Sequence, residues 1–160
     1  FYKKLAYTDV LTGIGNRAAF ELKLKELERN LSRRIGIVLY DLNNMKRIND
    51  TWGHAAGDAY LRRMAHLLIR EEPVRRGNAY RIGGDEFVTL FADEDRERLE
   101  RELELFHMAC SRVEVNGQPI TFAYGLAEYD SALDGGSLHG TLSRADALMY
   151  RSKKAGRAAC

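Results

Sequence analysis

The segment Arg81-Ile82-Gly83-Gly84-Asp85-Glu86-Phe87 places two glycines and two carboxylates directly before a β-rich run, Phe87 to Phe91. Glycine takes a positive φ without steric cost and lets a ligand approach the backbone, so Gly83-Gly84 suits a tight turn beneath a nucleotide or a phosphate. The strand that follows would hold Asp85 and Glu86 on a rigid element. The pattern predicts a β-hairpin with an acidic tip, although these residues alone fit an ordinary hairpin with solvated acids equally well.

A third carboxylate follows a second apolar segment. Ile35 to Tyr40 is a compact run with β-branched residues, which is typical of a central strand buried on both faces, and Asp41 comes directly after it. A lone acid at this position can simply cap a turn. Together with the acids of the hairpin it could instead share a metal ion, because Mg²⁺ is usually held by one or two carboxylates plus substrate phosphates.

Three polar residues mark the next segment, in which Gly53 separates one short helix from another that begins near Ala55: Asn49, His54 and Asp58. One interpretation is helix capping. The other is recognition of guanine, because a carboxylate accepts hydrogen bonds from N1–H and the exocyclic amine together, while an amide donates to O6 or N3. Adenine offers no such pair of donors, so the second interpretation favours GTP through Asp58.

The last predicted helix runs from about Leu142 to Gly156, buries Leu142, Ala145, Leu148 and Met149, and ends in a basic cluster of Lys153, Lys154 and Arg157. Cations at a helix C-terminus interact favourably with its dipole, which explains the cluster without any ligand. Alternatively, the cluster neutralises the phosphates of a nucleotide. Arg81 likewise either braces the hairpin or lies on its surface.

The remaining segments alternate between helical and extended patterns. Helices are predicted from Arg17 and over Leu99 to Cys110, and the helix that begins near Ala55 is predicted to continue from Tyr60 to just before Pro73. Two strands, 113–115 and 119–127, are predicted to join at Asn116-Gly117, which is a strong hairpin signal, and Tyr129 to Thr141 is predicted to be a mobile loop. Asp9 to Arg17 holds turn residues in which an acid and a base could brace the chain. This alternation predicts an α+β domain.

Composition excludes several classes of protein. The chain has 160 residues, of which 45% are hydrophobic and 30% charged, and this fits one globular domain over residues 1–160. A net charge of +2 with interleaved signs does not indicate a nucleic-acid-binding protein. No apolar run is long enough to span a membrane, so we expect no membrane contact by this domain. Cys110 and Cys160 lack metal-ligand spacing, and the expected location is the reducing cytoplasm.

Four blocks together resemble the GGDEF family of diguanylate cyclases, and the resemblance spans nearly the whole chain. The blocks are Asp9 to Arg17, Asp41 to Asp58, the hairpin segment, and Ala145 to Arg157. The resemblance implies the palm-like fold of nucleotidyl cyclases, with a mainly antiparallel sheet of about five strands flanked by helices. It also implies that Phe1 to Tyr7 ends a signalling helix from an upstream sensory or regulatory domain, which could anchor the full-length protein in a membrane.

The resemblance assigns roles to individual residues. Metal ligands would be Asp41, the carbonyl of Leu42, Asp85 and Glu86, which would hold two Mg²⁺ or Mn²⁺ ions per active site. Asp85 and Glu86 are the catalytic candidates. The residues expected to contact GTP are Asn49, His54, Asp58, Gly83, Gly84, Lys153 and Arg157. The Arg-x-x-Asp motif with which many family members bind the cyclic product would fall on Val74 and Gly77, so that product site is expected to be absent.

The implied reaction is condensation of two GTP into cyclic di-GMP and two pyrophosphates, by attack of each 3′-hydroxyl on the α-phosphate of the facing GTP. Since one domain would hold one GTP, catalysis would require a homodimer. Two alternatives remain open at this point. One is a catalytically inactive module of the same fold that binds GTP and regulates a partner domain, and the other is an unrelated structural domain.

Overall fold

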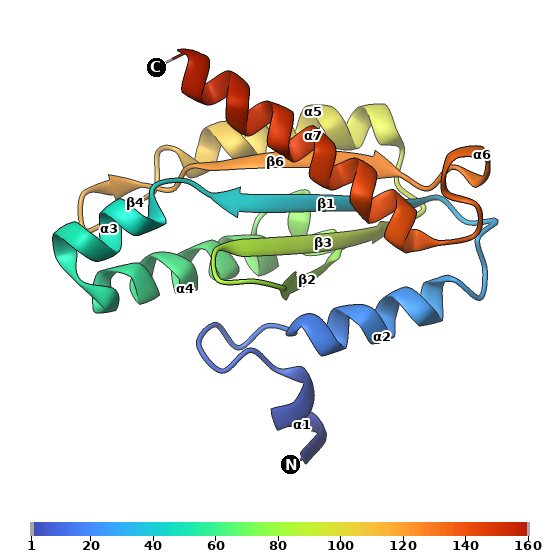
Figure 1. Ribbon diagram of the computed structural model, residues 1–160, viewed down its shortest axis with the longest axis horizontal. Coiled ribbons are helices and arrows are strands. Elements are labelled where there is room, and N and C mark those ends of the chain that lie inside the picture. The colour runs from blue at the N-terminus through green and yellow to red at the C-terminus, as the bar shows by residue number, and fades with distance from the viewer. Residues whose placement is uncertain (1, 160) are drawn as a thin grey trace.

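The computed structural model describes the backbone of residues 2–159 and the side chains of residues 4–156. Its main antiparallel sheet has the strand order β2-β3-β1-β6, and a small ribbon pairs β4 with β5 (Figure 1). The strands are β1 Ile35–Leu42, β2 Asn78–Arg81, β3 Glu86–Ala92, β4 Glu114–Val115, β5 Gln118–Pro119 and β6 Phe122–Glu128. The helices are α1 Tyr2–Tyr7, α2 Arg17–Leu27, α3 Met45–Trp52, α4 His54–Arg70, η1 Val74–Arg76, α5 Arg96–Cys110, α6 Ser131–Asp134 and α7 Leu138–Ala159.

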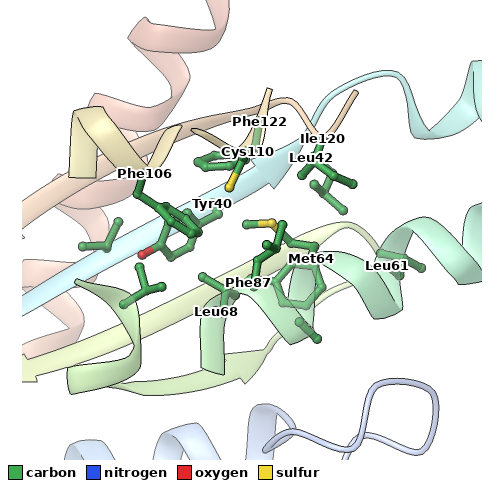
Figure 2. Packing of buried hydrophobic residues seen from close by; sticks show 14 of the residues in the cluster. Tyr40, Leu42, Leu61, Met64, Leu68, Phe87, Phe106, Cys110, Ile120 and Phe122 are labelled. Carbon is green, nitrogen blue, oxygen red and sulfur yellow. The ribbon is translucent and has the colours of Figure 1, made fainter. Parts of the chain in front are cut away.

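The main sheet is covered on both faces, and the alternation of side chains along β1 divides the core into two clusters. Val38, Tyr40 and Leu42 pack with α4 and α5, where Met64, Leu68 and Phe106 are among the buried partners (Figure 2). The intervening residues of β1, Ile35, Ile37 and Leu39, pack with α2 and α7. Because successive residues of a strand point to opposite faces, Asp41 belongs to the face covered by α7.

Helix α7 lies unusually close to β6 because the strand presents small residues to it. Ala123, Gly125 and Ala127 share this face of β6. A Cβ atom built at Gly125 would lie 2.5 Å from the backbone nitrogen of Met149 and closer still to the carbonyl oxygen of Ala145. Glycine at this position therefore sets the distance between α7 and the sheet.

Several boundaries differ from those predicted. Asp41 lies inside β1 instead of after it, because the strand continues its pairing with β3 and β6 beyond Tyr40. The predicted strand 119–127 is divided into β5 and β6, so the main sheet has four strands and the ribbon supplies the rest.

The predicted mobile loop Tyr129 to Thr141 is wrong. It contains α6, whose N-terminus is capped by the Asp130 carboxylate, and the first turns of α7, which begins at Leu138 and continues past Gly156. Asp134 fastens α6 to α7 because its buried carboxylate accepts hydrogen bonds from Thr141 (2.7 Å) and Arg144 (2.8 Å). Leu148, predicted to be buried, is 38% exposed.

Among the described helices, none combines the length and the hydropathy that crossing a bilayer requires.

Candidate active site

The hairpin between β2 and β3 brings its carboxylates beside the end of β1. Asp41 is the cross-strand partner of Glu86, and the backbone N–H of Leu42 donates to the carbonyl of Asp85 at 3.0 Å. The N–H of Ile82 donates to the carbonyl of Glu86 at 3.0 Å and closes the tip. The predicted positive φ is wrong for both Gly83 and Gly84. The reversal is spread over residues 82–86, so no residue of the tip has to adopt the left-handed conformation.

Asp41 is a buried acid, and only one of its two carboxylate oxygens accepts a hydrogen bond from a described residue. Its residue is 8% exposed, and Lys153 of α7 donates to Oδ2 at 2.6 Å. Oδ1 is buried and has no hydrogen-bond partner among the described residues. An unpaired buried carboxylate oxygen is costly, because it has lost its water without gaining a donor. Such an atom is therefore available to a ligand.

The two hairpin acids hold their protons more tightly than isolated acids do. Burial raises the pKa of Asp85, the charge of Asp41 raises it further, and Lys153 partly opposes both effects. Burial also raises the pKa of Glu86, with further contributions from Asp41, Asp146 of α7 and Asp85. Several acids thus share the positive charge of a single lysine, which is an arrangement that a bound cation would stabilise.

These donors fit a divalent metal ion, as the unpaired Oδ1 of Asp41 and the raised pKa of Asp85 both indicate. Asp41, Asp85 and the carbonyl of Leu42 at the end of β1 are the candidate ligands, with Glu86 as a further one. Within residues 4–156, no three carboxylate, imidazole or thiol side chains form a complete metal-binding group. A cation held here would therefore need oxygen atoms from a substrate or from water, as Mg²⁺ sites commonly do.

A pocket of about 470 Å³ adjoins the hairpin tip and reaches the corner between α3 and α4. Its lining residues are Met45, Lys46, Asn49, Asp50, His54, Leu61, Arg81, Gly84 and Asp85. The structure thus brings Asn49 and His54 together with Gly84 and Asp85. Asp58 is half-buried in α4, one turn after His54, and does not line this pocket.

Two charged residues of this pocket, Lys46 and Asp50, were not among the site residues predicted from the sequence. Both lie on α3, where Lys46 precedes Asn49 by three residues and Asp50 by four. Residues at these spacings are neighbours on a helix surface. The three-residue spacing from Asn49 could have identified Lys46, and the four-residue spacing from Lys46 leads in turn to Asp50.

Arg81 connects the hairpin tip to the N-terminal turn, which decides between its two predicted roles. Its guanidinium donates to the carbonyl of Gly84 at 2.7 Å and to the carboxylate of Asp9 at 3.2 Å. Asp9 also accepts from the N–H of Thr12 at 3.0 Å and from its hydroxyl at 2.6 Å. The base that braces Asp9 is therefore Arg81, whereas Arg17 pairs with Glu21 on α2.

The basic cluster at the end of α7 is divided. Lys153 faces Asp41, whereas the ammonium of Lys154 lies 5.5 Å from the centre of the Tyr150 ring. The side chain of Arg157 is outside the described residues. At the positions that correspond to the product-binding motif, Val74 is buried, and a Cβ at Gly77 would lie 2.7 Å from the carbonyl oxygen of Leu90. Position 77 therefore has no room for a side chain.

Comparison with known proteins identifies relatives along the whole domain. A family model described as "Diguanylate cyclase, GGDEF domain" matches residues 6–159. Diguanylate cyclase VdcA of Vibrio cholerae is 31% identical over 163 residues, which cover 97% of this chain and 46% of that protein. The chain therefore spans less than half the length of this relative.

Solved structures give the same result. The coiled coil and GGDEF domain of DgcB from Caulobacter crescentus, in complex with c-di-GMP, matches with a TM-score of 0.82 and 31% identity, covering 97% of this chain and 84% of that one. Diguanylate cyclase SiaD from Pseudomonas aeruginosa, in complex with its activator SiaC, matches with a TM-score of 0.81 and 27% identity, covering 97% and 61%.

Proposed function

The chain belongs to the GGDEF-domain family of diguanylate cyclases, and from this membership and its geometry we propose that it condenses two GTP molecules into cyclic di-GMP and two pyrophosphates. The observation that carries the proposal is the buried Asp41 carboxylate, with Oδ2 held by Lys153 and Oδ1 unpaired beside Asp85 and Glu86. Phosphoryl transfer depends on positioning and charge neutralisation, and these residues supply anchors for both.

The substrate would lie between the hairpin tip and the corner between α3 and α4. Asn49 and His54 are proposed to contact the nucleoside, because both line the pocket. Asp58 is proposed to select guanine, because its carboxylate can accept hydrogen bonds from both the N1–H and the exocyclic amine of that base. Lys153 and Arg157 would neutralise the triphosphate, and the exposed Gly83-Gly84 backbone would let it approach the tip.

In the proposed reaction the 3′-hydroxyl of one GTP attacks the α-phosphate of the other, and the bond to the leaving pyrophosphate breaks. Two bound Mg²⁺ or Mn²⁺ ions would supply charge neutralisation at the phosphates. Asp85 is the proposed acceptor of the hydroxyl proton: burial and the charge of Asp41 raise its pKa in the ligand-free domain, and bound metal ions would lower it. Glu86 would support the same charge centre from the neighbouring position of β3.

Two domains must face each other for both bonds of the cyclic product to form, so we propose a homodimer as the active species. The upstream segment that leads into α1 is proposed to carry the sensory or regulatory input that brings the domains together. Its relatives support such a context, because DgcB carries a coiled coil and SiaD binds an activator. Since GTP is the substrate, the proposed site of action is the cytoplasm.

The test is incubation of the domain at high concentration with GTP and Mg²⁺, in parallel with ATP and with EDTA, followed by chromatography with mass detection. Cyclic di-GMP should form only from GTP in the presence of metal. A coiled coil fused before Phe1 supplies the dimer if the domain alone is inactive. A dimeric fusion that binds GTP and yields no product would contradict the proposal and leave the regulatory module as the function.

The matched variant for this assay is Asp85→Asn, which keeps the size of the side chain and removes its charge and basicity. Turnover should fall at least about 100-fold, the usual contribution of a positioned acid or base. Glu97→Gln, on the exposed face of α5, is the control for removal of an acid elsewhere. Turnover of Asp85→Asn within a few-fold of the parent would remove Asp85 from the mechanism.

A further inference from the structure

The corner between α3 and α4 holds an unusually close contact between Asn49 and Gly57. Gly53, with φ of 89°, separates the two helices, and its N–H donates to the carbonyl of Asn49 at 2.9 Å. The Asn49 side chain then turns across the corner onto the backbone of Gly57. A Cβ built at Gly57 would overlap Oδ1 of Asn49 and lie 2.9 Å from its Cγ. No side chain fits at position 57 while Asn49 keeps this conformation.

Gly57 cannot readily move away from this contact, whereas the end of the Asn49 side chain can. Gly57 lies in the first turns of the 17-residue helix α4, where its N–H donates to the carbonyl of Gly53 at 3.3 Å. The next turn of α4 is anchored in the core by Tyr60 and Leu61, which are 1% and 5% exposed. A methyl group at position 57 would therefore displace the Asn49 side chain. Because Asn49 lines the pocket, that displacement changes the pocket wall.

A glycine within a helix is less stable than an alanine there, because its backbone loses more conformational freedom on folding. At Gly57, the space in which a side chain would lie is filled by Asn49, which also lines the pocket. We propose that Gly57 is a positioning residue for the substrate: the missing side chain fixes the conformation in which the Asn49 amide faces the nucleoside. This inference rests on the proposed function and adds to it a residue that never touches GTP.

The test is a double-mutant cycle on binding of a non-hydrolysable GTP analogue with Mg²⁺, measured by calorimetry. Gly57→Ala and Asn49→Ala should each weaken binding at least about tenfold, the loss of roughly one well-made hydrogen bond to the base. In the Asn49→Ala background the clash no longer exists, so adding Gly57→Ala should change the affinity less than twofold. Affinity for inorganic tripolyphosphate should be the same in all four proteins, since the contact concerns the nucleoside.

A structural readout accompanies binding. In NMR spectra of the ligand-free domain, the side-chain amide resonance of Asn49 is identified by its loss in Asn49→Ala. It should shift in Gly57→Ala, while the other resonances keep the dispersion of a folded domain. Ala55→Ser adds an atom to the exposed side of the same turn of α4 and is the control, with parental affinity and an unshifted Asn49 resonance.

Three results would overturn the inference. One is parental affinity in Gly57→Ala, and another is a full additional loss when Gly57→Ala is placed in the Asn49→Ala background. The third is an unshifted Asn49 resonance. A parent domain that fails to bind the GTP analogue would instead overturn the proposed function itself, and with it any role for Gly57 in substrate binding.

Discussion

Asp85 illustrates how the site works at the scale of a residue, because its folded environment opposes its negative charge. Burial and the charge of Asp41 raise its pKa above the ordinary value of 3.8. The folded domain therefore binds this proton more tightly than the unfolded chain does. The stability that this proton contributes is complete below the unfolded pKa and is lost as the pH rises through the folded pKa. At neutral pH the ligand-free site is accordingly destabilised by its own charges.

Asp85→Asn should therefore make the ligand-free domain more stable at pH 7 while it abolishes turnover. A rise in Tm is expected, because the neutral amide carries no charge for burial and Asp41 to oppose. Thermal melts in EDTA over a range of pH check this, and the difference should narrow as the pH falls through the folded pKa of Asp85, because the parent carboxylate then takes up a proton as well. A variant that melts below the parent at pH 7 would show that the charge of Asp85 is not opposed in the folded state.

Base selection is also predicted to depend on a single residue, because one carboxylate, that of Asp58, would contact the guanine. Asp58→Ser removes the group that would accept from both guanine donors, so the preference for GTP over ATP should fall at least about tenfold. Competition between the two nucleotides in the turnover assay measures the ratio, with Ala55→Ser as a control on the same helix. An unchanged ratio would assign base selection to Asn49, His54 or other residues of the pocket.

At the scale of an element, helix α7 determines the geometry of the site. It runs across the sheet (Figure 1), and its Lys153 donates a hydrogen bond to Asp41. Its position depends on Gly125, where the backbone atoms of Ala145 and Met149 leave no room for a side chain. Gly125→Ala should push α7 outward and lengthen the contact between Lys153 and Asp41. We expect a loss of about 1–3 kcal/mol in the free energy of unfolding together with reduced turnover.

Denaturant unfolding and the turnover assay measure these two effects of Gly125→Ala. Gly36→Ala is the matched control, since a Cβ at Gly36 in β1 would meet the side chain of Leu126 at an ordinary 3.6 Å. Equal effects of the two substitutions would indicate a general cost of alanine in the sheet, and would remove the role assigned to the close approach of α7.

At the scale of the whole molecule, the proposed reaction needs two copies of the domain. In the described part of each chain, the acids Asp41, Asp85 and Glu86 lie beside a pocket that would hold one nucleotide, whereas the product contains two nucleotides joined by two bonds. Specific activity should therefore rise with protein concentration, and a coiled coil fused before Phe1 should raise it further and remove that dependence. Initial rates over a hundredfold range of concentration test this. A constant specific activity in a protein that is monomeric by light scattering would contradict the dimer.

Local sequence patterns were sufficient to predict those strands, helices and turns whose characteristic residues all lie within one segment. The apolar run from Ile35 predicted the central strand, the patterns before Pro73 and over Leu99 to Cys110 predicted helices, and the glycines with their acids predicted the hairpin. These features depend on the periodicity of side chains along the chain, which the sequence records directly. The resemblance of four motifs to those of the GGDEF family also predicted the family. The glycine-rich stretch after Tyr129 was predicted wrongly: the Asp130 cap is a local signal that the prediction overlooked, whereas the Asp134–Arg144 ion pair joins two helices and depends on the folded chain.

By itself, the sequence determined the family, the α+β class and the residue types of the site. Only the tertiary structure decided which of those residues meet. It paired Lys153 with Asp41 over 112 positions of sequence, gave Arg81 to Asp9 in place of Arg17, and showed that Gly57 makes room for Asn49. The physical reason is that a local pattern fixes the direction of a side chain along its own element. The distance between two elements depends instead on packing, here on glycines whose missing Cβ atoms let backbones and polar groups approach.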